Sequence, residues 1–112
     1  MTFLHKDLAA GRWFQLSLVE QLANVGMDIE RAIQWKRRKD DESSQSAFFR
    51  ALDLLDLTIA DPKHRKRLRE ILRARELLID YFVYDNEYGS TDELWQSYFF
   101  AFNYAAAIRR GK

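Results

Sequence analysis

The chain has 112 residues, of which 47% are hydrophobic and 31% are charged, and it contains no cysteine. These proportions are typical of one folded domain, spanning residues 1–112, rather than of a disordered chain. Without cysteine the chain forms no disulfide, no thiolate metal site and no cysteine nucleophile. The 18 basic and 17 acidic residues give a net charge of +1, which predicts no general attraction to nucleic acid or anionic lipid.

No stretch of the sequence approaches the roughly 20 apolar residues that a membrane span requires. The first eleven residues carry His5, Lys6 and Asp7 before any long apolar run, which is not the pattern of a secretory signal. We therefore expect a cytoplasmic protein with no membrane segment.

Three short breaks divide the sequence into four stretches that have the apolar spacing of amphipathic helices. The predicted helices span residues 12–38, 44–60, 62–84 and 91–110. In the first, Leu18, Leu22, Val25 and Ile29 recur at spacings of four and three. Gly26 interrupts this helix at a cost of about 1 kcal/mol relative to alanine, so we expect a neighbouring helix to approach it closely.

Local signals mark the ends of the predicted helices. Ser43 or Ser44 is suited to cap the second helix, and the pair 61–62, an aspartate followed by a proline, is suited to begin the third. Ser90, with Glu93 three residues later, has the spacing of a capping box for the fourth. Because the connections are short, the sequence predicts an all-α fold, an antiparallel four-helix bundle.

Two pairs of acidic residues share predicted helix faces, Asp53 with Asp56 and Glu76 with Asp80. Such pairs could hold magnesium beside a phosphate, as in a metal-dependent nucleotide hydrolase. They resemble the acidic helices of all-α nucleotide pyrophosphohydrolases, but the Glu-x-x-Glu and Glu-x-x-Asp spacing of that family is not met. Solvated acids paired with basic side chains are the interpretation that we favour.

The two histidines are His5 and His64, and neither follows a glutamate by three residues as di-iron bundles require. His64 lies in a run of basic residues and is expected to be exposed and neutral. The sequence contains no nucleophile motif and no glycine-rich phosphate loop. We therefore predict no catalytic residue, no metal site and no cofactor.

Among the predicted helices, the third is the one locally basic element. Its candidate nucleic-acid contacts are Lys63, Arg65, Lys66, Arg69 and Arg73. Cations at the N-terminus of a helix oppose its dipole, which favours a binding role such as contact with RNA or DNA. A solvated or salt-bridging face is the alternative that we favour. Arg75 falls on the apolar face instead, and we expect it to pair with Asp28, Asp53 or Asp80.

The predicted fourth helix carries more aromatic side chains than one face of a small bundle can cover. Its expected buried stripe includes Tyr98 and Phe102, from which Phe99 and Phe100 point away. Such a surplus indicates an interface. The candidate interface residues are Trp13, Phe14, Trp35, Trp95, Phe99 and Phe100. The segment 85–90 before this helix is either a simple helix termination or a binding loop, and we favour the first.

Three segments resemble an uncharacterised family of small prokaryotic all-helical proteins. They are GRWFQLSLVEQLANVG (residues 11–26), ALDLLDLTIADPKHRKRL (51–68) and YFVYDNEYGS (81–90). The resemblance covers nearly the whole chain and implies a helical fold, but it brings no catalytic residues. At the level of helix count the chain is also similar to the S23-like and HEPN groups of four-helix proteins. The HEPN ribonuclease motif, an arginine followed after four to six residues by a histidine, has no counterpart here.

These patterns predict a non-enzymatic interaction or scaffold protein that self-associates, with a homo-oligomer or another protein as its partner. One alternative is an RNA- or DNA-associated protein that binds through the basic third helix. The other, which we favour least, is a metal-dependent nucleotide hydrolase.

Overall fold

The computed structural model describes residues 11–110, and within them the fold is an all-α bundle with no β-strand. Its helices are α1 (Leu18–Arg37), α2 (Asp41–Ala60), α3 (Leu68–Phe82) and α4 (Asp92–Arg110). Two short 3-10 helices, η2 (Trp13–Gln15) and η3 (Pro62–Arg67), precede α1 and α3. The predicted fold class is confirmed. Predictions for residues 1–10, including His5, lie outside the described part of the chain.

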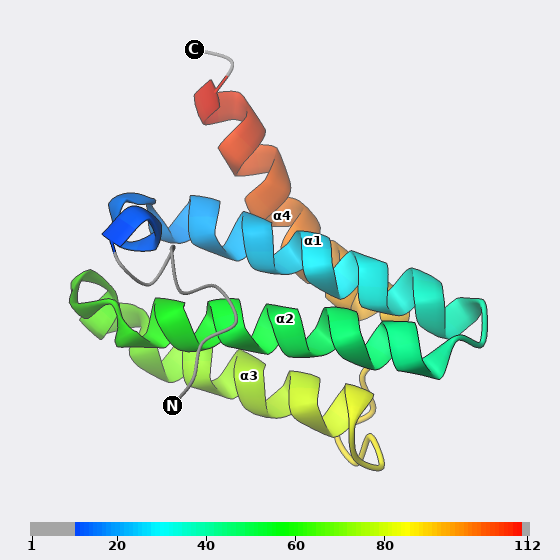
Figure 1. The fold of residues 1–112 in the computed structure, drawn as a ribbon. Helices are drawn as coiled ribbons and strands as arrows, with labels where there is room; N and C mark the ends of the chain where they lie inside the picture. Colours follow the sequence, from blue (N-terminus) through cyan, green and yellow to red (C-terminus); the bar gives the residue numbers. More distant parts are fainter. Residues whose placement is uncertain (1–10, 111–112) are drawn as a thin grey trace.

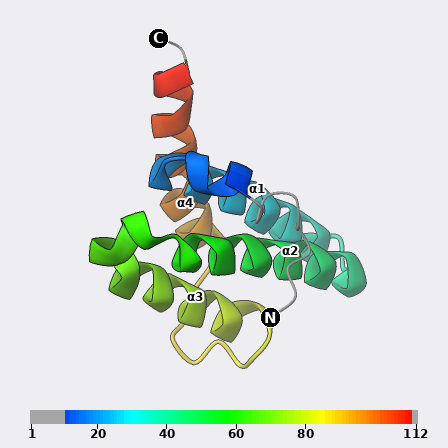
Figure 2. The same ribbon diagram turned by 60° about the vertical axis from the view of Figure 1, so that its left-hand side comes forward.

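The helices pack in the order α4, α1, α2, α3. Figures 1 and 2 show α2 between α1 and α3, with these three helices side by side, whereas α4 crosses α1 steeply. In both views the C-terminal half of α4 extends beyond the other helices. Within residues 11–110, no helix combines the length and the apolar character needed to cross a membrane.

Helices α1 and α4 meet at Gly26, as the sequence analysis expected. A Cβ atom placed on Gly26 would lie 2.7 Å from the Cβ atom of Phe99 on α4. Phe99 is only 3% exposed and packs into the core beside Trp95. The small glycine therefore admits the aromatic side chain that attaches α4 to the bundle.

The first two helices begin at other residues than predicted. Helix α1 starts at Leu18 rather than Arg12, because Leu16 is extended and Ser17 forms a capping box with Glu20. Helix α2 starts at Asp41, before either predicted cap. The carboxylate of Asp40 accepts the backbone N–H of Ser43 at 3.0 Å and caps this helix.

The predicted third helix is divided in two. The Asp61 carboxylate caps η3 by accepting the backbone N–H of Lys63 at 3.1 Å, with Pro62 at the first position, which confirms the predicted start. His64 has non-helical backbone angles, and the regular α3 begins only at Leu68.

The fourth helix has a different cap from the predicted one. Its first turn is capped by Thr91, whose hydroxyl accepts the backbone N–H of Leu94 at 3.0 Å. At Ser90, the predicted cap, the backbone oxygen accepts a hydrogen bond from the side-chain amide of Asn86, and the backbone N–H donates to the Oδ1 atom of the same amide.

Candidate functional site

Helix α4 presents an exposed aromatic face. Residues 94–108 include no charged residue, whereas about five would be expected from the charged fraction of the whole chain. Phe100, Tyr104 and Ile108 recur at intervals of four and are 65%, 60% and 46% exposed. The rings of Phe100 and Tyr104 stack with their centroids 6.1 Å apart. These three residues form one stripe, here called the α4 face.

The six predicted interface residues do not lie together. Trp13, Trp95 and Phe99 are at most 3% exposed and belong to the hydrophobic core, so the structure corrects the prediction for these three. Phe14 is partly buried against that core. Trp35 is 36% exposed near the end of α1, where the guanidinium of Arg38 lies 5.3 Å from its ring centroid. Phe100 is the member that lies on the α4 face.

The predicted basic contacts divide into engaged and free side chains. Lys63 forms an ion pair with Asp61, and Arg73 lies 3.8 Å from Glu76. In the described part of the chain, no acidic partner is found for three of them, Arg65, Lys66 and Arg69. Because η3 has three residues per turn, Arg65 loses the regular helical spacing to Arg69 and Arg73 that the sequence analysis assumed.

His64 is buried, contrary to the prediction that it is exposed. Its Nε2 atom lies 2.9 Å from Oε1 of Gln21 and 3.4 Å from the Asp61 carboxylate. Burial lowers the pKa of His64, and the positive charges of Lys63 and Arg67 lower it further. The negative charge of Asp61 acts in the opposite direction but is outweighed, so the imidazole is neutral. Burial acts to raise the pKa of Asp61, but hydrogen bonds from Lys63 and Gln21 outweigh it, and the net shift is downward.

This buried polar cluster also holds the segment before α1. The side-chain amide of Gln21 donates to the backbone oxygen of Trp13 at 2.9 Å, and the Trp13 indole donates to Thr58 on α2 at 3.2 Å. Within residues 11–110 the only buried side-chain polar atom without a partner is Nε1 of Trp95, outside this cluster. The polar groups of the buried cluster around His64 are therefore all hydrogen-bonded within the protein, and we assign this cluster a structural role.

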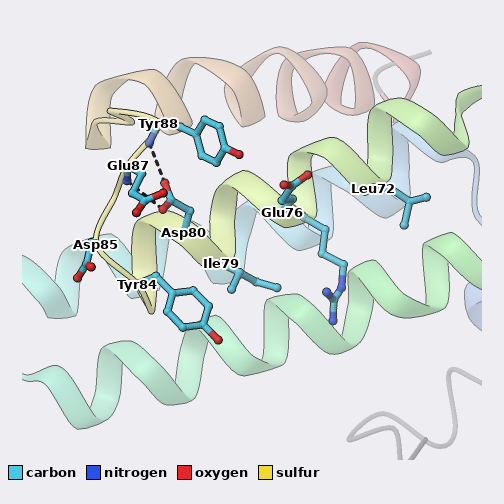
Figure 3. A pocket seen from close by; sticks show the side chains of 9 residues that line it. Leu72, Glu76, Ile79, Asp80, Tyr84, Asp85, Glu87 and Tyr88 are labelled. Carbon is cyan, nitrogen blue, oxygen red and sulfur yellow. Dashed lines mark hydrogen bonds between the residues drawn. The ribbon is translucent and has the colours of Figure 1, made fainter.

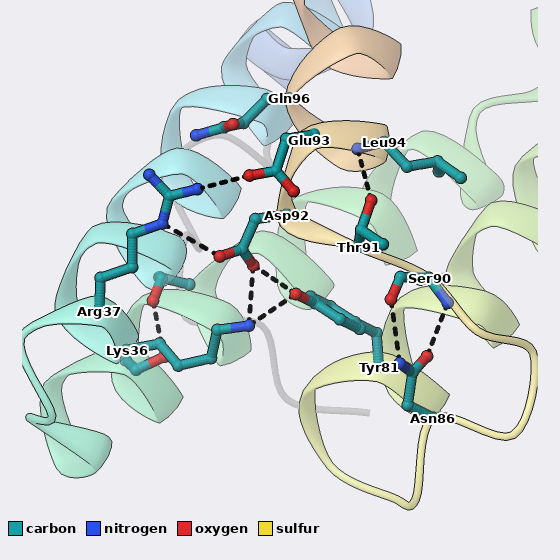
Figure 4. A network of polar contacts seen from close by, with 12 residues as sticks. Lys36, Arg37, Tyr81, Asn86, Ser90, Thr91, Asp92, Glu93, Leu94 and Gln96 are labelled. Carbon is teal, nitrogen blue, oxygen red and sulfur yellow. Dashed lines mark hydrogen bonds and ion pairs between the residues drawn. The ribbon is translucent and has the colours of Figure 1, made fainter.

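A second polar network fixes the start of α4 (Figure 4). Asp92 accepts hydrogen bonds from Lys36 at 2.8 Å, from Arg37 at 3.1 Å and from the hydroxyl of Tyr81. Burial acts to lower the pKa of Lys36, but its hydrogen bonds with Asp92 and Tyr81 outweigh it and raise the pKa. Burial raises the pKa of Tyr81, with the hydrogen bond to Asp92 adding to it. The network ties α4 to the ends of α1 and α3.

The acidic residues considered for magnesium make other contacts within the described part of the chain. Among the described residues, no group of three or more histidine, aspartate or glutamate side chains is placed to hold an ion. Asp56 is bound instead by Arg75 at 2.8 Å, which corrects the predicted partners of that arginine. Asp80 accepts the backbone N–H groups of Glu87 and Tyr88 at 2.9 and 3.1 Å.

A pocket of about 450 Å³ lies beside α3, formed with the segment that follows this helix. Its apolar wall comes from Leu72 and Ile79, and its rim carries Tyr84 and Tyr88. Figure 3 shows the Tyr84 ring beside Ile79 and the Tyr88 ring on the other side of α3, near Asp80. The remaining lining residues are Arg75, Glu76, Asp80, Asp85 and Glu87. We call this site the α3 pocket. Asp85, Glu87 and Tyr88 belong to the segment 85–90, which was expected to be a simple helix termination.

The comparisons with known proteins add no relative of this chain. No protein-family model, no curated protein and no solved structure matches it.

Proposed function

We propose that this protein is a cytoplasmic, self-associating interaction module, and that the α4 face packs against the same face of a second copy. The observation that carries this proposal is the exposed apolar stripe of Phe100, Tyr104 and Ile108 in a helix with no charged residue between positions 94 and 108. Exposed apolar patches of this kind are typical of interaction sites.

The composition of α4 fits a second copy of the same helix. Ala101 and Ala107 are exposed beside the bulky stripe, and small residues allow two helices to approach closely. In an antiparallel pair related by a two-fold axis, the aromatic side chains of one helix lie against the alanines of the other. The absence of charge means that such a pairing leaves no ionised group buried without a partner.

The position of α4 also supports this arrangement. Its C-terminal half extends beyond α1, α2 and α3 (Figures 1 and 2). A second copy could therefore reach the α4 face without displacing the other helices. Because a domain of about 110 residues has a limited core, burying this face against a partner would add stability to each copy.

Light scattering coupled to size-exclusion chromatography tests the proposal. We expect a dimer for the unaltered chain and a monomer for Phe100→Glu, because the substitution places a charge at the centre of the apolar contact. Phe49→Glu is the matched control, since Phe49 is an exposed phenylalanine on α2, and it should leave the dimer intact. A monomeric unaltered chain at high concentration, or equal dissociation by both substitutions, contradicts the proposal.

Nucleic-acid binding is a second candidate function, because Arg65, Lys66 and Arg69 have no acidic partner within the described residues. If these three residues contact phosphates, the logarithm of the binding constant should fall with the logarithm of salt concentration at a slope of roughly −2 to −3. Replacing all three with glutamate should abolish binding to a mixed-sequence RNA or DNA. Unchanged binding by that variant would exclude this role for them.

A further inference from the structure

The α3 pocket lies on a different part of the molecule from the α4 face and plays no part in the proposed self-association. Its volume of about 450 Å³ falls within the range of pockets that bind ligands. Leu72 and Ile79 supply apolar surface, whereas Tyr84 and Tyr88 remain 72% and 54% exposed at the rim. The pocket thus offers both apolar walls and aromatic rings to a ligand.

The charges around this pocket are unbalanced. Four carboxylates line it, and the single guanidinium among the lining residues, that of Arg75, is bound to Asp56. Asp80 is 8% exposed and accepts two backbone N–H groups, but it forms no ion pair with any residue of the described chain. These two N–H groups satisfy Asp80 within the chain, so the preference for a cationic ligand comes from the surplus of carboxylates over free cations among the lining residues.

The structure already contains a guanidinium group at the edge of the pocket. The Arg73 guanidinium lies 5.2 Å from the ring centroid of Tyr88, within the range of a cation–π contact. The same side chain lies 3.8 Å from Glu76. One rim tyrosine and one wall carboxylate are therefore occupied by a cation from the chain itself, and a ligand with the same chemistry would compete for both.

A shallow groove continues the pocket along α3. Leu72 and Glu76 line both hollows, and Leu68, Arg69 and Arg73 complete the groove. Together they form an elongated surface that is acidic at the pocket and basic at Arg69. An extended peptide would cover this surface better than a compact small molecule would.

We propose that the α3 pocket binds an arginine side chain from an extended segment of a partner protein. The guanidinium lies against the rim tyrosines and faces the carboxylates of Asp80, Asp85 and Glu87, while its aliphatic stem packs on Ile79. Arginine suits this site because its planar group both stacks on aromatic rings and pairs with carboxylates. Apolar residues beside the arginine lie toward Leu72, and Arg73 acts as an internal competitor at the entrance.

Titration calorimetry with two tripeptide amides, acetylated Leu-Arg-Leu and its Leu-Gln-Leu counterpart, tests this assignment. We expect the arginine peptide to bind at least about tenfold more tightly. The double substitution Asp85→Asn with Glu87→Gln should weaken it by a similar factor. The matched control, Asp41→Asn with Glu42→Gln, removes two exposed acids from α2 and should leave binding unchanged.

Arg73→Gln supplies a test of opposite sign. Because it frees Tyr88 and Glu76, it should tighten binding of the arginine peptide several-fold. Phe100→Glu should leave peptide binding intact, which separates this site from the proposed dimer contact. Equal binding of the two peptides, an unaffected double substitution, or weaker binding by Arg73→Gln would overturn the proposal. Equally tight binding of free n-butylguanidinium would overturn the assignment to a peptide segment.

Discussion

The contact between Gly26 and Phe99 can be tested by adding a single methyl group. In Gly26→Ala the new Cβ would lie 2.7 Å from Cβ, 3.0 Å from Cγ and 3.1 Å from Cδ1 of Phe99. Carbon atoms in favourable contact are about 3.5–4.0 Å apart, so the overlap approaches 1 Å. Because the nearest atom is the Cβ of Phe99, rotation of that side chain leaves the overlap in place, and α4 must move away from α1.

Two opposing effects set the size of this change in stability. Alanine favours a helix over glycine by up to about 1 kcal/mol. Overpacking a core costs about 1–3 kcal/mol, and the upper part of that range applies where the backbone must shift. We therefore expect Gly26→Ala to lower the free energy of unfolding by about 1–2 kcal/mol. For a domain of this size that corresponds to a melting temperature lower by roughly 4–8 °C.

Urea denaturation followed by circular dichroism measures this difference. Ser46→Ala, at an exposed position of α2, reports the effect of helix propensity without a new contact and should slightly stabilise the protein. A Gly26→Ala variant that is as stable as the unaltered chain, or more stable, would refute this close approach of α1 and α4.

Three further predictions concern the polar contacts. Burial lowers the pKa of His64 below its ordinary 6.5, so the unfolded chain binds the proton more readily and stability falls as the pH drops below 6.5. Urea titrations at about pH 7.5 and about pH 5 should show this loss, and His64→Gln should remove it. Arg75→Gln leaves the largely buried Asp56 without its ion pair and should lower the free energy of unfolding by about 1–2 kcal/mol in the same assay. Arg67→Gln breaks an exposed ion pair and should lower it by less than about 0.5 kcal/mol. Thr91→Ala removes the cap of α4 and should lower the free energy of unfolding by about 1 kcal/mol. Thr91→Ser keeps the hydroxyl and should retain most of the stability of the unaltered chain.

The helical fold was predictable because the apolar spacing and the breaks between helices are strong local signals. The first residues of the helices were less predictable, although the sequence contains the signal for the start of α1. Ser17 and Glu20 have the spacing of a capping box, but the apolar residues around Trp13 extend the helical pattern across that boundary. For η3 the sequence predicted the cap at Asp61, but no local pattern predicts the non-helical backbone at His64.

The candidate sites were harder to predict because they depend on contacts between distant residues. His64 is buried through Gln21, which is 43 residues away in the sequence. Arg75 pairs with Asp56 because α3 packs beside α2, and its spacing on α3 does not specify which acid it meets. The α3 pocket arises where the segment after α3 folds back onto Asp80, an arrangement fixed by two hydrogen bonds from backbone N–H groups to the Asp80 carboxylate.

The orientation of α4 shows most clearly why the sequence alone was insufficient. A stripe identifies the buried face of a helix only when the opposite face is polar, and residues 94–108 carry no charge on either face. The expected buried stripe therefore left Phe99 outside the core. In the structure Phe99 faces α1 instead, because only a residue without a side chain at position 26 lets Phe99 approach α1 so closely. Once Phe99 points inward, its neighbour Phe100 must point outward, and Tyr104 follows it one turn later. A glycine on α1 thus determines which aromatic residues of α4 are available to a partner.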